Sequence, residues 1–73
     1  MNSDFVIRVI EERPFVPFRV YLADGRTRRV RHPEMVELER FGAAVTIYDD
    51  KGRGELIDSG MIVSFKYARA FNK

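Results

Sequence analysis

An alternating run of apolar and polar residues, followed by an Asp-Gly pair, is the feature that most constrains this fold. Residues 18–22 read Phe-Arg-Val-Tyr-Leu, so every second side chain is apolar. That pattern is typical of a strand with one buried face. Asp24-Gly25 favours a reversal of the chain, and residues 26–31 supply a returning strand. The sequence therefore predicts an antiparallel hairpin.

The positions of the apolar residues also select the kind of turn. A two-residue Asp-Gly loop pairs Arg19 with Val30 and separates Val30 from the apolar face of the first strand. A three-residue loop over residues 23–25, with Gly25 left-handed, pairs Phe18 with Val30 and keeps the apolar side chains together. We therefore expect a type I turn with a bulge, although Asp-Gly pairs usually form two-residue turns.

The rest of the chain predicts one helix and further short strands. Residues 4–12 read as a helix with Ser3 as its N-cap, ended by Pro14. Alternation predicts strands in residues 35–40, 43–48, 55–57 and 62–67, with a single helical turn over 33–38 as the alternative for the first of these. The expected core consists of Phe5, Val9, Phe18, Val20, Leu22, Val30, Val36, Leu38, Val45, Ile47, Val63 and Phe65.

These elements indicate one small, mainly β domain over residues 1–73. We expect the N-terminal helix to be followed by a β meander over residues 18–67 with about five strands. In a chain this short, closure into a strongly bent five-stranded sheet or small barrel removes exposed strand edges. The helix would then cover one open end.

Composition excludes many catalytic sites. The chain has no cysteine and one histidine, so it offers neither a thiol nucleophile nor a site built from two imidazoles. His32-Pro33-Glu34 lacks a partnering nucleophile, and Lys51 and Arg53 interrupt the acidic residues 49–58 where a calcium loop needs oxygen ligands. We expect no enzyme activity, no cofactor, no metal site and no small-molecule substrate. With no signal peptide or membrane span expected, the prediction is a cytoplasmic, bacterial protein.

The basic residues are concentrated in one segment of the chain. The 13 basic and 11 acidic residues nearly balance, but residues 26–32 contain four arginines and no acid. One interpretation is a cross-strand ladder in which residues 35–40 pair back and bring Glu34, Glu37 and Glu39 to the arginines. The other is a phosphate-binding strand. The candidate nucleic-acid or anion-binding residues are Arg28, Arg29, Arg31, Tyr21 and Lys66.

Two resemblances add expectations. The segments RPFVPFR (residues 13–19), LADGR (22–26) and VRHPE (30–34) resemble a pattern in a family of very short uncharacterised bacterial proteins, which implies no activity. The hairpin and LIDSGMIV (56–63) are more loosely similar to the Sm-like small β-barrel, a fold close to SH3-like barrels. That resemblance implies ring-forming RNA binders, although residues 35–37 do not reproduce that family's RNA-reading loop.

Two functional hypotheses follow. The first is a non-catalytic interaction module that binds a protein partner or forms a homo-oligomer, through an edge strand near residues 62–68. The second is an RNA- or DNA-binding barrel that uses the arginine-rich second strand. The direction of the side chains in residues 26–31 distinguishes them.

Overall fold

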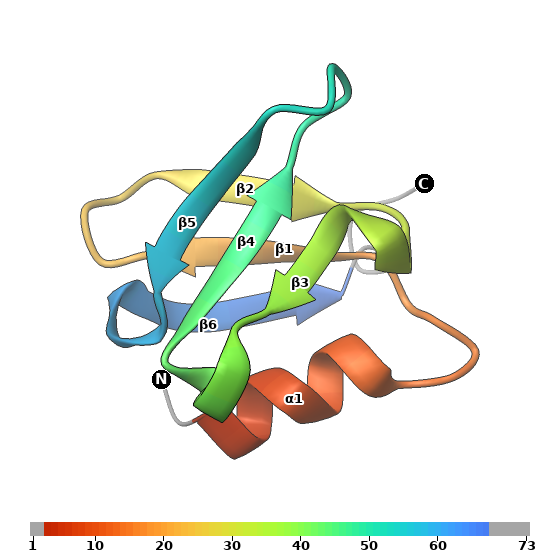
Figure 1. The fold of residues 1–73 in the computed structure, drawn as a ribbon, viewed down its shortest axis with the longest axis horizontal. Helices are drawn as coiled ribbons and strands as arrows, with labels where there is room; N and C mark the ends of the chain where they lie inside the picture. Colours follow the sequence, from red (N-terminus) through yellow and green to blue (C-terminus); the bar gives the residue numbers. More distant parts are fainter. Residues whose placement is uncertain (1–2, 68–73) are drawn as a thin grey trace.

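The computed structural model describes residues 3–67, which form one helix and six strands (Figure 1). The elements are α1 Ser3–Glu11, β1 Phe18–Leu22, β2 Thr27–Val30, β3 Val36–Leu38, β4 Ala44–Tyr48, β5 Gly54–Asp58 and β6 Ile62–Tyr67. Single 3₁₀ turns occupy Pro33–Met35, Arg40–Gly42 and Ser59–Met61. No helix in residues 3–67 is long and apolar enough to cross a membrane.

The strands form two three-stranded antiparallel sheets, in the orders β2-β1-β6 and β3-β4-β5. Figure 1 shows the two sheets crossing one another in separate layers. The expected five-stranded barrel and simple meander are therefore wrong in detail, because the sheets do not close and β6 returns to β1. The turn at Pro33–Met35 explains the break, since it separates β2 from β3 where one bent strand would otherwise continue.

The central hairpin has the predicted register. Phe18 pairs with Val30, and Gly25 has a φ of 91°, which is the left-handed conformation that glycine adopts without strain. The amide of Gly25 donates to the carbonyl of Leu22 at 3.0 Å. The three-residue loop is confirmed, and with it the argument from the apolar positions.

The segment after the hairpin combines both predicted alternatives. Pro33–Met35 forms one 3₁₀ turn, and Val36–Leu38 then becomes β3. Proline suits the start of the turn because its missing amide hydrogen has no helical partner there. β3 pairs with β4 rather than with β2, and Val36 lies opposite Ile47.

The core lies between the sheets and α1. Its buried hydrophobic side chains are Val6, Val9, Phe18, Val20, Leu22, Val30, Val36, Val45, Ile47, Ile57 and Ile62. The sequence missed Val6, Ile57 and Ile62. Leu38 and Phe65 are partly buried against this core.

Two expected core residues are exposed. Val63 is 57% exposed because the register of β6 against β1 shifts between Ser64 and Ile62, which turns Val63 out of the alternation. Phe5 is 48% exposed, and its ring stacks on Phe65 at 6.2 Å. The helix spans Ser3–Glu11 rather than residues 4–12, so Ser3 is its first residue rather than the capping position.

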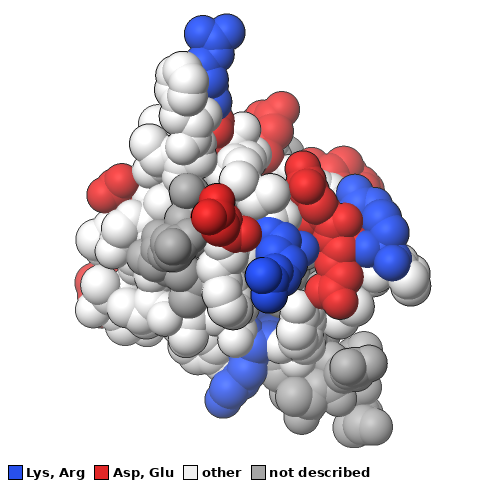
Figure 2. Space-filling view, turned by 90° about the horizontal axis from the view of Figure 1, so that it is seen from below, with Lys and Arg blue, Asp and Glu red and all other residues white. Residues whose placement is uncertain are grey.

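The helix covers one side of the two-layer structure. Figure 1 shows α1 lying along the side where β3 and β6 are the sheet edges. Val6 and Val9 point into the core, and the Tyr67 hydroxyl donates to Glu12 Oε1 at 2.8 Å. Figure 2 shows this side of the molecule, where acidic and basic side chains are interspersed among uncharged ones.

A cationic sheet face and an adjoining groove

The five candidate binding residues separate into two groups. Tyr21, Arg29 and Lys66 project from the outer face of the β2-β1-β6 sheet, because they alternate with the buried residues of their strands. Arg28 and Arg31 instead form ion pairs with acidic side chains of the β4–β5 hairpin. The arginine run therefore has two structural environments.

Three cationic side chains occupy one row across the outer face. Arg19 of β1 lies opposite Arg29 of β2 on one side and opposite Lys66 of β6 on the other. We call these three residues the cationic row. Neighbouring strands are about 4.8 Å apart, so the three side chains start from adjacent positions on one face. An anion beside Arg29 and Lys66 would be attracted by both positive charges.

Tyr21 lies beside the row and contacts one of its members. The Lys66 Nζ atom is 5.7 Å from the centroid of the Tyr21 ring, an arrangement favourable for a cation over a π face. Neither Arg29 nor Lys66 forms an ion pair with another side chain within residues 3–67. The ammonium and guanidinium groups can thus accept an anionic partner without breaking such a pair.

Arg26 and Arg28 connect the two sheets. The Arg28 Nε donates to Glu55 Oε1 at 2.6 Å, and Arg26 Nη1 lies 3.2 Å from Glu55 Oε2. The hydrogen bond from Arg28 lowers the pKa of Glu55 and raises that of Arg28. Because β2 and β5 are edges of different sheets, this ionic contact spans the side opposite α1.

The predicted ladder of arginines with Glu34, Glu37 and Glu39 is wrong. β3 pairs with β4 rather than with β2, and within residues 3–67 none of these three carboxylates forms an ion pair with an arginine. Glu37 instead accepts a hydrogen bond from the Tyr48 hydroxyl at 3.0 Å, which raises the pKa of Tyr48. The idea that acids neutralise part of the run holds, but the acids are Glu55 and Asp50, which are distant in sequence.

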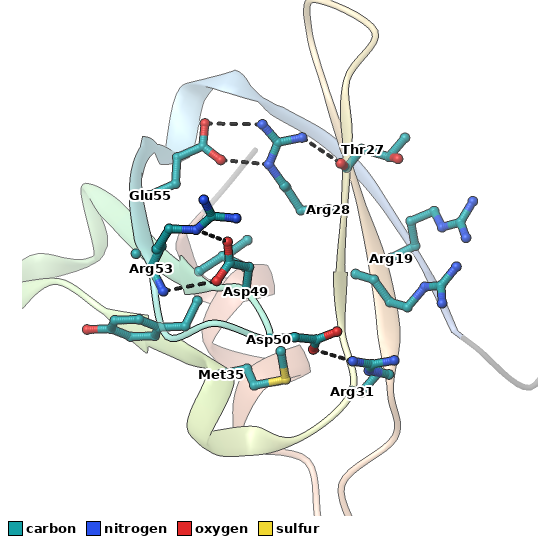
Figure 3. A pocket seen from close by; sticks show the side chains of 13 residues that line it. Arg19, Thr27, Arg28, Arg31, Met35, Asp49, Asp50, Arg53 and Glu55 are labelled. Atoms are coloured by element: carbon teal, nitrogen blue, oxygen red, sulfur yellow. Dashed lines mark hydrogen bonds and ion pairs between the residues drawn. The ribbon is translucent and has the colours of Figure 1, made fainter.

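A groove of about 630 Å³ opens between β2 and the β4–β5 hairpin (Figure 3). Among the described residues, its lining includes five arginines and three carboxylates, so the groove has an excess of positive charge. Arg19 and Arg29 of the cationic row belong to this lining. The outer face and the groove therefore form one continuous basic surface.

Ion pairs shape the far wall and the mouth of the groove. Arg31 pairs with Asp50 of the β4–β5 turn, and Figure 3 shows this contact linking the two walls. Asp49 accepts hydrogen bonds from the backbone amide and the guanidinium group of Arg53, at 2.9 and 2.8 Å. The hydrogen bond from the backbone amide is the main cause of the lowered pKa of Asp49. Met35, Ile47 and Tyr48 provide apolar lining.

Sequence reasoning missed Arg19, Asp50 and Glu55 as members of this surface. Arg19 could have been found, because the correct register of the hairpin already places it opposite Arg29. No pattern in the sequence places Asp50 and Glu55 near β2, because only the packing of the two sheets brings them there. Within residues 3–67 no group of three or more His, Asp or Glu side chains is arranged to hold a metal ion.

The described surface is thus suited to binding anions by charge and hydrogen bonds. Guanidinium groups bind phosphate and carboxylate oxygens in a planar, two-point geometry, and an ammonium group binds them as a point charge. The chain matches no protein-family model, no curated protein and no solved structure.

Proposed function

We propose that this domain is a non-catalytic binding module for single-stranded nucleic acid, and that the cationic row binds phosphates of the strand. The observation behind the proposal is the register that sets Lys66, Arg19 and Arg29 side by side on one sheet face. A chain of phosphates is a ligand that meets several such cations at once.

The two environments of the arginines refine this proposal. Arg29 and Lys66 act in binding, with Tyr21 holding Lys66 in place. Arg28 has a structural role through Glu55, so its guanidinium group is already engaged and is not one of the phosphate-binding groups. Arg31 contributes only when a phosphate replaces Asp50 as its partner. Of the five candidate residues, Arg29 and Lys66 are therefore the ones whose loss weakens binding most.

The test is a salt titration of binding to a 20-nucleotide single strand of mixed sequence. We expect the wild-type affinity to fall steeply as salt rises. The variant Arg29→Gln/Lys66→Gln should bind about tenfold or more weakly, with its slope against log salt reduced by about 1.4, because each phosphate contact on a single strand contributes about 0.7.

Arg8→Gln is the matched control, since it removes one exposed positive charge from α1, outside the cationic row and the groove lining. It should leave the salt slope unchanged. Absence of salt-dependent binding, or an equal loss per charge in Arg8→Gln, would overturn the proposal because the row would then have no special role.

A second candidate function is association of two copies through β6. This strand is an edge of its sheet among the described residues, and it presents Val63 at 57% exposure. Of the expected segment 62–68, residue 68 lies outside the described residues. Light scattering on a chromatographically purified sample tests the idea: a dimer that Val63→Lys returns to a monomer supports it, and a strict monomer at high micromolar concentration excludes it.

We also propose that the fold is related to the Sm-like or SH3-like small barrels. A helix that precedes the strands and a last strand that returns beside the first are features that support it. Kinship of fold alone assigns no ligand. A cytoplasmic location, where single-stranded RNA is found, is the setting in which the proposed activity would operate.

A further inference from the structure

We propose that the groove between β2 and the β4–β5 hairpin seats one base of the bound strand. This inference rests on the proposed function, because the phosphates on the cationic row would bring the base to the groove. It adds a second kind of contact, made to the ring of the nucleotide rather than to its charge.

The groove has the size and lining that a flat heterocycle needs. At about 630 Å³ it falls within the range of small-molecule pockets, roughly 300–1,000 Å³. Among the apolar lining residues, Ile47 is only 5% exposed, and the Tyr48 hydroxyl is hydrogen-bonded to Glu37, which is not a lining residue. Met35 is therefore the main apolar side chain against which a ring can pack. A methionine side chain adapts its shape to an incoming ring, and its sulfur makes favourable contacts with aromatic edges.

Continuity with the cationic row decides which ligand enters. Arg19 and Arg29 belong both to the row and to the lining of the groove. A strand whose phosphate lies on Arg29 therefore has the adjoining nucleoside at the mouth of the groove. The base itself is neutral, and the excess of arginine over carboxylate in the lining attracts the phosphate that adjoins it.

The ion pair between Arg31 and Asp50 limits this binding. The side chains of Arg31 and Asp50 are 46% and 70% exposed, so the pair is accessible to solvent and contributes little to stability. A phosphate that approaches Arg31 competes with the Asp50 carboxylate. Removing that carboxylate should therefore strengthen binding of the strand.

The experiment compares a 10-nucleotide single strand with an abasic strand of the same length and charge. We expect the wild-type domain to bind the base-containing strand about tenfold more tightly, because packing a ring against Met35 removes apolar surface from water. Met35→Gln, which preserves side-chain length but adds an amide, should reduce that preference. In NMR spectra, the base-containing strand should shift the methyl signals of Met35 and Ile47, and the abasic strand should not.

Asp50→Asn tests the competition at Arg31, with Asp58→Asn as its matched control. Both variants remove one exposed carboxylate, but Asp58 is not part of the groove lining. We expect Asp50→Asn to raise affinity more than Asp58→Asn does, and equal effects would contradict the role of Asp50. If the two strands bind equally tightly and the base-containing strand leaves the methyl signals of Met35 and Ile47 unshifted, the base seat is wrong while the proposed function stands. If neither strand binds, the proposed function itself fails.

Discussion

Each sheet has two edge strands, and the edges of the two sheets meet on two sides of the molecule. Different kinds of contact join the sheets on these two sides. Where β3 and β6 are the edges, α1 inserts Val6 and Val9 into the core and Phe5 stacks on Phe65. Where β2 and β5 are the edges, Arg26 and Arg28 reach across to Glu55. One side is closed by apolar contact and the other by charge.

The main stabilising contacts and the groove lie on different sides of the molecule. Apolar burial excludes water and is the larger contributor to the free energy of folding. Partly exposed ion pairs contribute little, but they keep charge at the surface and leave room beside them. The groove lies on this second side, between β2 and the β4–β5 hairpin. The cationic row begins beside the groove at Arg29 and reaches Lys66 of β6, at the opposite edge of the sheet.

The largest expected effect comes from placing a charge on the helix side. Val9 is 2% exposed, and Val9→Asp would bury a carboxylate among apolar side chains. We expect a loss of at least about 3 kcal/mol in the free energy of unfolding, enough to abolish folding in a domain this small. Circular dichroism during thermal unfolding measures it. Arg8→Asp, at the exposed neighbouring position, should retain a cooperative transition, and equal behaviour of the two variants would contradict the apolar closure.

A smaller effect is expected from the ionic side. Arg28→Gln and Glu55→Gln should each lower the free energy of unfolding by about 1 kcal/mol, because the contact is a charge-assisted hydrogen bond screened by solvent. The side chains are 32% and 36% exposed. In urea unfolding, the double variant should lose less than the sum of the two single variants. Strict additivity would show that the two residues do not act together.

The smallest effect is the pH dependence of this same contact. The pKa of Glu55 is held below its ordinary value of 4.5 by the hydrogen bond from Arg28. The unfolded chain therefore binds more protons in acid, so the contribution of Glu55 is full above about pH 4.5 and is lost as pH falls through its lower native pKa. The difference in unfolding free energy between wild type and Glu55→Gln should shrink from pH 7 to pH 3. A difference that stays constant would exclude the ionised pair.

Local patterns were enough to predict much of the fold. The alternation in residues 18–22 and the need to keep Val30 on the same face identified both the hairpin and its three-residue loop. These features depend on neighbours in sequence, where strand periodicity and turn geometry act directly. Val63 escaped prediction because a shift of register in one strand pair reverses the face of a side chain, and no residue type marks that shift.

The 3₁₀ turn at Arg40–Gly42 shows the same limit. Phe41 is 90% exposed and has a φ of 71°, a conformation unusual for a phenylalanine. The buried hydroxyl of Ser59 donates to the carbonyl of Gly42 at 2.7 Å, and the Ser59 amide donates to Ala43 at 2.9 Å. The conformation of this turn is thus supported by a residue 17 positions away, beyond the reach of local sequence rules.

The sequence alone was enough to predict the helix, the approximate strands, the register of the hairpin and a dense run of arginine. What those arginines contact depends on how the two sheets pack. Alternation along β2 sends Arg28 toward β5 and Arg29 to the outer face, but their partners come from distant strands. The physical reason is that periodicity acts between near neighbours, whereas the packing of two sheets brings Glu55 and Asp50 to β2 and sets Lys66 and Arg19 beside Arg29.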